Sequence, residues 1–147
     1  MSASTTQSGP TLADLGPQPL LLVEDDAPLR QMLSWDLTDL GYDVGAAAGC
    51  AEARRLVGRY PFRFALIDVR LPDGDGRELA AELTACYPAL HVVLMSGDHV
   101  THPPARPEQR IHAFLTKPVD IGIIHRLFTA AVGMLRPVDR ERQPVWA

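Results

Sequence analysis

The chain has 147 residues, the size of one ordinary domain. Hydrophobic residues make up 46% of it and charged residues 22%, as is typical of soluble globular proteins. The net charge is −4 and Lys and Arg are not clustered, so the composition gives no electrostatic basis for unspecific nucleic-acid binding.

The two ends of the chain differ in composition from its middle. Residues 1–18 are rich in Ser, Thr, Gly and Pro and contain no Lys or Arg, so we expect a disordered tail and neither a signal peptide nor a membrane anchor. Residues 137–147 predict a second tail, which leaves 19–136 as one folded domain. Cys50 and Cys86 form no CxxC motif, so we expect a reduced, cytoplasmic protein in which both are small buried apolar residues.

Between these tails, apolar runs alternate with segments of helical periodicity. In chain order we expect strand 19–23, helix 28–40, strand 42–46, helix 51–59, strand 64–68, helix 77–86, strand 90–95, strand 111–115 and helix 120–135. Asp26 and Asp120 are expected helix caps, and Gly41 is an expected helix stop. The alternation predicts an α/β fold, with a doubly wound, five-stranded parallel sheet covered by helices on both faces.

The helix over 28–40 carries a stripe of apolar residues at three- and four-residue spacing. Its members are Leu29, Met32, Leu33, Leu37 and Leu40. This spacing places them on one face and favours a core role for Leu29 and Met32. The alternative is that these two residues and Arg30 form a docking surface, and Trp35, beside the stripe, is compatible with either role.

The segment 98–110 does not fit the alternation. It should hold a helix between the last two strands, but it contains Pro103, Pro104 and Pro107. Because a proline inside a helix costs about 3 kcal/mol, we expect an irregular fourth helix here.

Polar side chains stand at the ends of four predicted strands. They are Glu24 with Asp25, Asp68, Ser96 and Lys117. The carboxyl ends of parallel strands meet at one edge of the sheet, where α/β proteins bind ligands. Taken singly, the acids have simpler explanations as helix caps or turn residues. Those explanations leave the matching positions of Ser96 and Lys117 unaccounted for.

The residue types at these strand ends suit phosphoryl chemistry. Neighbouring carboxylates repel each other unless a cation neutralises them, and Mg²⁺ prefers oxygen ligands of this kind. A phosphoryl ligand would give Lys117 a role as counter-charge and Ser96 a role as hydroxyl donor. A carboxylate can itself accept a phosphoryl group, and Asp68 is the best-placed candidate.

Five short motifs carry these residues. They are Leu21-Leu22-Val23-Glu24-Asp25-Asp26, Leu66-Ile67-Asp68, Leu71-Pro72 with Asp75-Gly76, Met95-Ser96-Gly97 and Leu115-Thr116-Lys117-Pro118. In this order and spacing they resemble the receiver domain of two-component response regulators over about residues 20–135. The resemblance implies a flavodoxin-like sheet with strand order 2-1-3-4-5.

The resemblance also implies a role for each site residue. Asp68 would be the phosphoacceptor, and Ser96 and Phe114 would be the switch residues. Lys117 would pair with the phosphate, and the Lys117–Pro118 bond would be cis. The implied Mg²⁺ ligands are Asp25, Asp68, Glu24 through water, and the backbone carbonyl of Arg70. From its position alone, Phe114 is equally well explained as a core residue of its strand.

In function, the resemblance implies a signalling switch rather than an enzyme. A histidine kinase or a histidine phosphotransfer protein would phosphorylate it, and a downstream protein effector would respond, with no direct nucleic-acid or membrane partner. Many relatives dimerise through a regular fourth helix, so the prolines of 98–110 predict a monomer or weak dimer.

Two alternatives remain from the sequence. One is a receiver module taken from a larger hybrid histidine kinase. The other is a Mg²⁺-dependent phosphohydrolase of the haloacid dehalogenase type, although that family places a second acid two positions after its nucleophile and Arg70 stands there in this chain. Dinucleotide binding is disfavoured because no GxGxxG follows the first strand.

Overall fold

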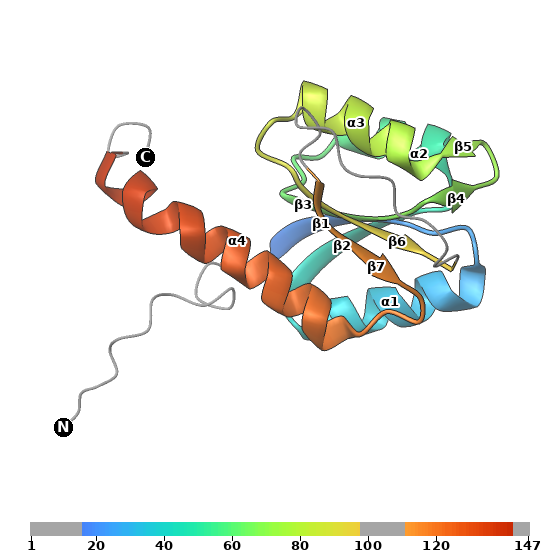
Figure 1. Cartoon of the computed structure of the whole chain (residues 1–147), viewed down its shortest axis with the longest axis horizontal. Coiled ribbons are helices and arrows are strands. Elements are labelled where there is room, and N and C mark those ends of the chain that lie inside the picture. Colours follow the sequence, from blue (N-terminus) through green and yellow to red (C-terminus); the bar gives the residue numbers. More distant parts are fainter. Residues whose placement is uncertain (1–15, 98–110, 143–147) are drawn as a thin grey trace.

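A five-stranded parallel sheet forms the centre of the molecule (Figure 1). The computed structural model describes residues 16–97 and 111–142, with side chains as far as Gly133. The sheet strands are β1 (Gln18–Val23), β2 (Tyr42–Ala47), β3 (Phe64–Asp68), β6 (His91–Ser96) and β7 (Ile111–Thr116). Their spatial order is β2-β1-β3-β6-β7, which confirms the predicted doubly wound sheet and its strand order.

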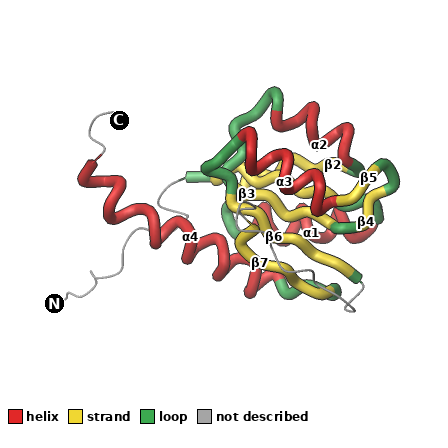
Figure 2. Tube along the Cα trace, turned by 45° about the horizontal axis from the view of Figure 1, so that its top comes forward, coloured by secondary structure: helices red, strands yellow, loops and turns green. Residues whose placement is uncertain are grey.

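Helices cover both faces of this sheet (Figure 2). They are α1 (Ala27–Asp39), α2 (Cys50–Val57), α3 (Gly76–Cys86) and α4 (Ile121–Arg142). Helices α1 and α4 pack on one face, and α2 and α3 on the other, as Figure 1 shows. The winding direction therefore reverses between β1 and β3, and a ligand site is expected at the carboxyl ends of these two strands.

Alternate residues of the central strands fill two separate cores. Leu20, Leu22 and Leu66 pack toward α1 and α4, whereas Leu21 and Ile67 pack toward α2 and α3. All five are fully buried. Because both faces are covered, these strands are apolar throughout instead of alternating with polar residues.

The predicted caps of α1 and α4 and the predicted end of α1 agree with the structure. The Asp26 carboxylate accepts a hydrogen bond from the Leu29 N–H at 3.3 Å, and the Asp120 carboxylate accepts one from Gly122 N–H at 2.8 Å. Gly41 follows α1 with φ at 104°, a left-handed conformation that glycine adopts without a steric penalty. These residues fix where α1 and α4 begin and where the chain turns into β2.

The last helix is longer than predicted. It continues to Arg142 instead of ending near Leu135, so residues 137–142 are helical where the sequence predicted a tail. The proline at position 137 removes one backbone donor from the helix but does not end it. In Figure 1 the distal part of α4 extends beyond the sheet.

Three side chains that the sequence placed in the core, or left undecided between core and surface, lie at the surface. Met32 is 49% exposed and Trp35 is 65% exposed, because only the Leu33 and Leu37 side of α1 reaches the buried face. Cys86 is also exposed, at the end of α3, whereas Cys50 is buried as predicted. The core interpretation was therefore wrong for Met32 and Cys86.

Between β3 and α3, where the sequence predicted no element, lies a short antiparallel hairpin of β4 (Arg70–Leu71) and β5 (Gly74–Asp75). Predictions for residues 1–15 and 98–110, including the irregular fourth helix, fall outside the described residues. Within the described ranges, no helix combines the length and apolar character that a membrane span requires.

Candidate functional site

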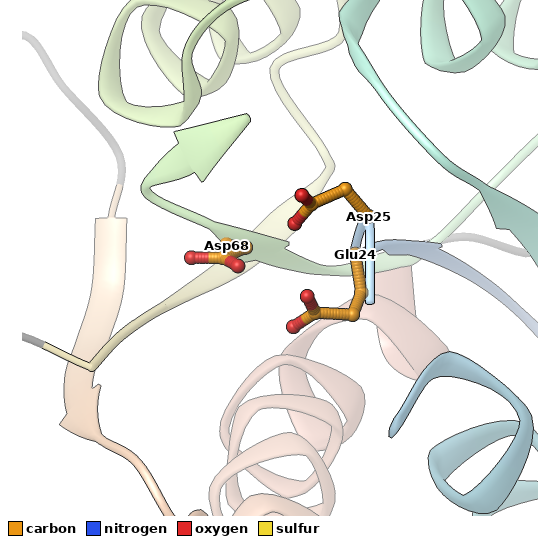
Figure 3. A group of neighbouring side chains, drawn as sticks. All are labelled: Glu24, Asp25 and Asp68. Atoms are coloured by element: carbon orange, nitrogen blue, oxygen red, sulfur yellow. The ribbon is translucent and has the colours of Figure 1, made fainter. Parts of the chain in front are cut away.

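Three carboxylates converge at the carboxyl ends of β1 and β3 (Figure 3). Asp68 is the last residue of β3 and Glu24 directly follows β1, and they are 4% and 0% exposed. Asp25 is exposed at the rim. One oxygen from each of the three lies within 4.8 Å of the others. The structure therefore brings together the acids that the sequence placed on separate strands.

Lys117 connects two of these acids. Its ammonium donates to Glu24 Oε1 at 2.7 Å and to Asp68 Oδ2 at 2.9 Å. It is the single lysine in the chain. A compact ammonium with three rotatable donors can bond two carboxylates at once, whereas arginine presents a planar fork suited to one. The Lys117–Pro118 bond that follows is cis, as expected.

Burial and pairing act in opposite directions on the ionisation of this cluster. Burial raises the pKa of Glu24 above its ordinary value, although the hydrogen bonds from Lys117 and the Asp26 N–H oppose this shift. Burial also lowers the pKa of Lys117, but its hydrogen bonds to Asp68 and Glu24 outweigh that effect and raise it. The ammonium therefore stays charged beside the two buried carboxylates.

The carboxylates fit a divalent cation. They line a hollow of about 630 Å³ together with Asp26, Arg70, Gly97 and Lys117. Ligands on opposite sides of Mg²⁺ lie about 4.2 Å apart, close to the spread of this cluster, and the ion keeps several waters. Glu24 Oε2 and Asp68 Oδ1 each accept one backbone N–H, from Asp26 and Arg70. Each of these oxygens keeps a second lone pair for a ligand.

Ser96 and Phe114 belong to a second hollow beside this one. Ser96 ends β6, is 4% exposed, and its carbonyl accepts the Lys117 N–H at 2.8 Å. Both side chains line a neighbouring hollow of about 510 Å³, and Arg70 lines both hollows. The predicted switch residues thus share a hollow, with Ser96 on the strand next to β3 and Phe114 one strand further out.

Comparison with known proteins agrees with this geometry. The sequence model of the response regulator receiver domain matches residues 20–129. The chain belongs to the response regulator receiver family. It is 34% identical over 128 residues to the transcriptional regulatory protein GlrR of Escherichia coli (strain K12), an alignment that covers 86% of this chain and 29% of GlrR. The receiver thus spans less than a third of that relative's length.

Solved structures show the same receiver fold. One is the CheY-like receiver domain protein from Methanospirillum hungatei JF-1, with a TM-score of 0.67 and 23% identity, covering 80% of this chain and 96% of that one. Another is the response regulator TrrA from Thermotoga maritima in complex with Mg²⁺-BeF, with a TM-score of 0.68 and 17% identity, covering 78% and 98%. Family membership decides the sequence-based choice between a receiver and a haloacid dehalogenase-type hydrolase in favour of the receiver.

The receiver's site also depends on a glycine that the sequence analysis named within a motif without giving it a role. Gly76 begins α3 and its N–H donates to the Val69 carbonyl at 2.7 Å. A β-carbon at this position would overlap the Asp68 carbonyl oxygen. Any side chain here would push α3 away from the end of β3, so Gly76 is needed to bring the two together.

Asp73 is a second residue that the sequence analysis did not single out. Its carboxylate accepts the N–H groups of Cys50 at 2.7 Å and Ala51 at 3.0 Å, and so caps α2 from the β3–α3 loop. The residue before α2 is Gly49, which has no capping side chain. The two backbone donors lower the pKa of Asp73, with that from Ala51 contributing most. The sequence shows that the N-cap position of α2 has no capping side chain, but it does not show that Asp73, far along the chain, supplies the missing cap.

Proposed function

We propose that this receiver is a phosphorylation switch that accepts a phosphoryl group on Asp68. The observation that carries this proposal is the contact of the buried Asp68 carboxylate with Lys117 at 2.9 Å, within one cluster with Glu24 and Asp25. A carboxylate held beside an ammonium and two more acids suits phosphoryl transfer, which depends mainly on positioning and charge neutralisation.

In the proposed reaction, a carboxylate oxygen of Asp68 attacks phosphorus. The donor is the phosphohistidine of a histidine kinase or a histidine phosphotransfer protein. The P–N bond breaks, and its electron pair stays on the imidazole nitrogen, which is then protonated. Lys117 holds Asp68 in place and offers positive charge to the transferred oxygens.

We assign Mg²⁺ as the cofactor of this step. Asp25 and Asp68 would hold it directly and Glu24 through water, with the Arg70 carbonyl as a further ligand. When bound, Mg²⁺ neutralises charge on the phosphoryl oxygens and between the carboxylates. The relative TrrA, solved with Mg²⁺-BeF, supports the assignment by fold.

The proposed output is a shift between two conformations. The phosphoryl group would draw the Ser96 hydroxyl toward Asp68, and Phe114, which shares a hollow with Ser96, would follow. A downstream protein effector would then recognise the changed surface. Ser96→Ala should leave phosphorylation of Asp68 in place while removing the accompanying change in the Phe114 NMR signals.

The direct test is phosphorylation by a small phosphodonor. The 147-residue chain, incubated with acetyl phosphate and Mg²⁺, should gain the mass of one phosphoryl group, and hydroxylamine should remove it. Asp68→Asn should abolish the gain, and Asp43→Asn, an exposed acid on β2, should not. A label that persists in Asp68→Asn, or repeated turnover of phosphate esters without a label, would contradict the proposal.

A further inference from the structure

Arg30 bonds the backbone of the acidic segment and not its carboxylates. From the fourth position of α1, its Nη1 donates to the Glu24 carbonyl at 2.8 Å and more weakly to the Asp25 carbonyl at 3.4 Å. Its own N–H donates to the Asp26 carbonyl at 2.8 Å. The guanidinium therefore contacts two consecutive carbonyls of the segment that joins β1 to α1, next to the first backbone bond of the helix.

The other restraints on this segment act on Glu24 and Asp26. Lys117 and the Asp26 N–H hold the two carboxylate oxygens of Glu24. The Asp26 carboxylate caps α1 through the Leu29 N–H. Asp25 lies between these residues and its side chain is exposed, so the guanidinium contact with its carbonyl restrains its backbone directly.

Arg30 also forms no ion pair within the described residues, although three acids precede it closely in the chain. A guanidinium that neutralised the cluster would bond carboxylate oxygens, and it would compete there with a metal ion. Bonding to carbonyls leaves the carboxylates available. The arrangement restrains the main chain while keeping the metal-facing oxygens open.

We infer that Arg30 is a positioning residue that fixes the β1–α1 segment so that Asp25 faces the cluster before Mg²⁺ binds. The inference rests on the proposed function, because it assigns Arg30 to the metal site of that function. Removing an outer contact that orients a metal ligand typically costs about 10-fold or more in affinity. A cation close to the site has the opposite electrostatic effect, since it repels Mg²⁺.

These opposite signs give a sharp test. Arg30→Gln removes the charge, and Arg30→Lys keeps the charge on a side chain one bond shorter, which does not reach the two carbonyls that Nη1 contacts. If Arg30 positions the segment, both variants should bind Mg²⁺ about 10-fold more weakly by isothermal titration calorimetry. If it acts only through charge, Arg30→Gln should bind Mg²⁺ more tightly and Arg30→Lys as the parent does, and either result would overturn the inference.

Arg54→Gln is the matched control. Arg54 is exposed on α2 and pairs with Glu82 at 2.9 Å, so this change removes the same charge away from the site. It should leave Mg²⁺ affinity unchanged, while an equal loss in Arg54→Gln would show that the Arg30 effect is not local. Thermal unfolding without metal should show that Arg30→Lys is folded, and the inference fails if that folded variant binds Mg²⁺ as the parent does.

The two proposals fail in different ways. A parent protein that binds no Mg²⁺ and accepts no phosphoryl group would contradict the proposed function. A parent that does both, with Arg30 variants that bind Mg²⁺ normally, would contradict only the role of Arg30. Backbone NMR of the metal-free variants gives an independent readout, since loss of positioning should shift or broaden the Asp25 amide signal.

Discussion

The two ends of the same sheet use different physical interactions. At the carboxyl end, Glu24, Asp68 and Lys117 are held by ion pairs at 2.7 and 2.9 Å. At the amino end, aromatic rings pack together: the Phe64 and Phe128 rings are tilted against each other with centroids 4.5 Å apart, and the Tyr42 ring meets Phe64 edge to face at 5.7 Å. β3 begins with Phe64 and ends with Asp68, so one strand of five residues connects both regions.

The contrast indicates where stability and chemistry reside. Apolar and aromatic burial contributes directly to the free energy of unfolding. A cluster of buried charges contributes little net stability, because desolvation offsets the pairing. We expect removal of packing at the amino end to destabilise the protein most while sparing its chemistry, and substitutions at the carboxyl end to remove the chemistry at a smaller cost in stability.

The largest effect on stability is expected for Phe64→Ala. Removing this fully buried ring should lower the free energy of unfolding by about 3–5 kcal/mol, because it leaves a cavity between Tyr42 and Phe128. Urea unfolding would measure the loss. The molecules of the variant that remain folded at low temperature should still accept a phosphoryl group. A variant that is folded but accepts none would contradict the proposed separation of stability at the amino end from chemistry at the carboxyl end.

A smaller loss is expected for Lys117→Met. This change leaves Glu24 and Asp68 without their shared cation. In the absence of metal, it should lower the free energy of unfolding by about 2 kcal/mol. The loss should be smaller than for a fully buried ion pair, because Lys117 is partly exposed. Phosphorylation should fall sharply. Unfolding measured with and without Mg²⁺ checks the cause, since the metal should restore part of the loss. If Mg²⁺ does not raise the free energy of unfolding of the variant, repulsion between Glu24 and Asp68 is not the cause of the lost stability.

Tyr42→Phe is expected to cost about 1 kcal/mol. The Tyr42 hydroxyl bonds His125 Nδ1 at 2.9 Å and so joins β2 to α4 at the amino end. Phenylalanine keeps the ring packing against Phe64 and removes only this bond. Denaturant unfolding of both proteins gives the difference, and a loss as large as that of Phe64→Ala would show that the hydroxyl, and not packing, dominates this region.

The smallest effect is a pH dependence from His125. Burial lowers the pKa of His125 below its ordinary value. Between the folded and unfolded pKa values the unfolded chain binds a proton that the folded chain does not, so stability falls as the pH is lowered through that window below about 6.5. Solvent screening at this half-buried site should keep the effect below about 1 kcal/mol.

The check compares the free energy of unfolding at pH 7.5 and pH 5.5 for the parent and for His125→Gln. The variant should lose less stability on acidification than the parent. His91 and His112, which contact each other edge to face at 5.9 Å, are present in both proteins and their contribution cancels. An equal loss in parent and variant would assign the pH dependence to other groups.

Much of the fold followed from local chemistry. The strand 64–68 was predicted with its observed bounds because an uninterrupted apolar run ended at a carboxylate before Leu71-Pro72. Asp26 and Gly41 marked the ends of the first helix for reasons that act within one or two turns. The site acids, Ser96 and Lys117 were found because each follows an apolar strand, and strand ends are readable from sequence.

Other features depended on residues far apart in the chain. Periodicity could not separate Met32 from Leu33, because which edge of an apolar stripe is buried depends on the angle at which α1 meets the sheet. Asp73 caps a helix that begins 23 positions earlier, so no local pattern shows it. Gly76 was visible within a motif, but its necessity comes from the Asp68 carbonyl that it approaches.

The sequence by itself determined the order of strands and helices and the polar residue at the end of each site strand. Backbone preference and hydrophobic periodicity act over a few residues, so both are encoded locally. The tertiary structure decided that Lys117 bonds Glu24 and Asp68 together and that Arg30 holds carbonyls instead of carboxylates. The Lys117 contacts form only when the ends of β1, β3 and β7 are aligned in one sheet, and the Arg30 contacts depend on the direction in which α1 leaves β1. Packing sets both.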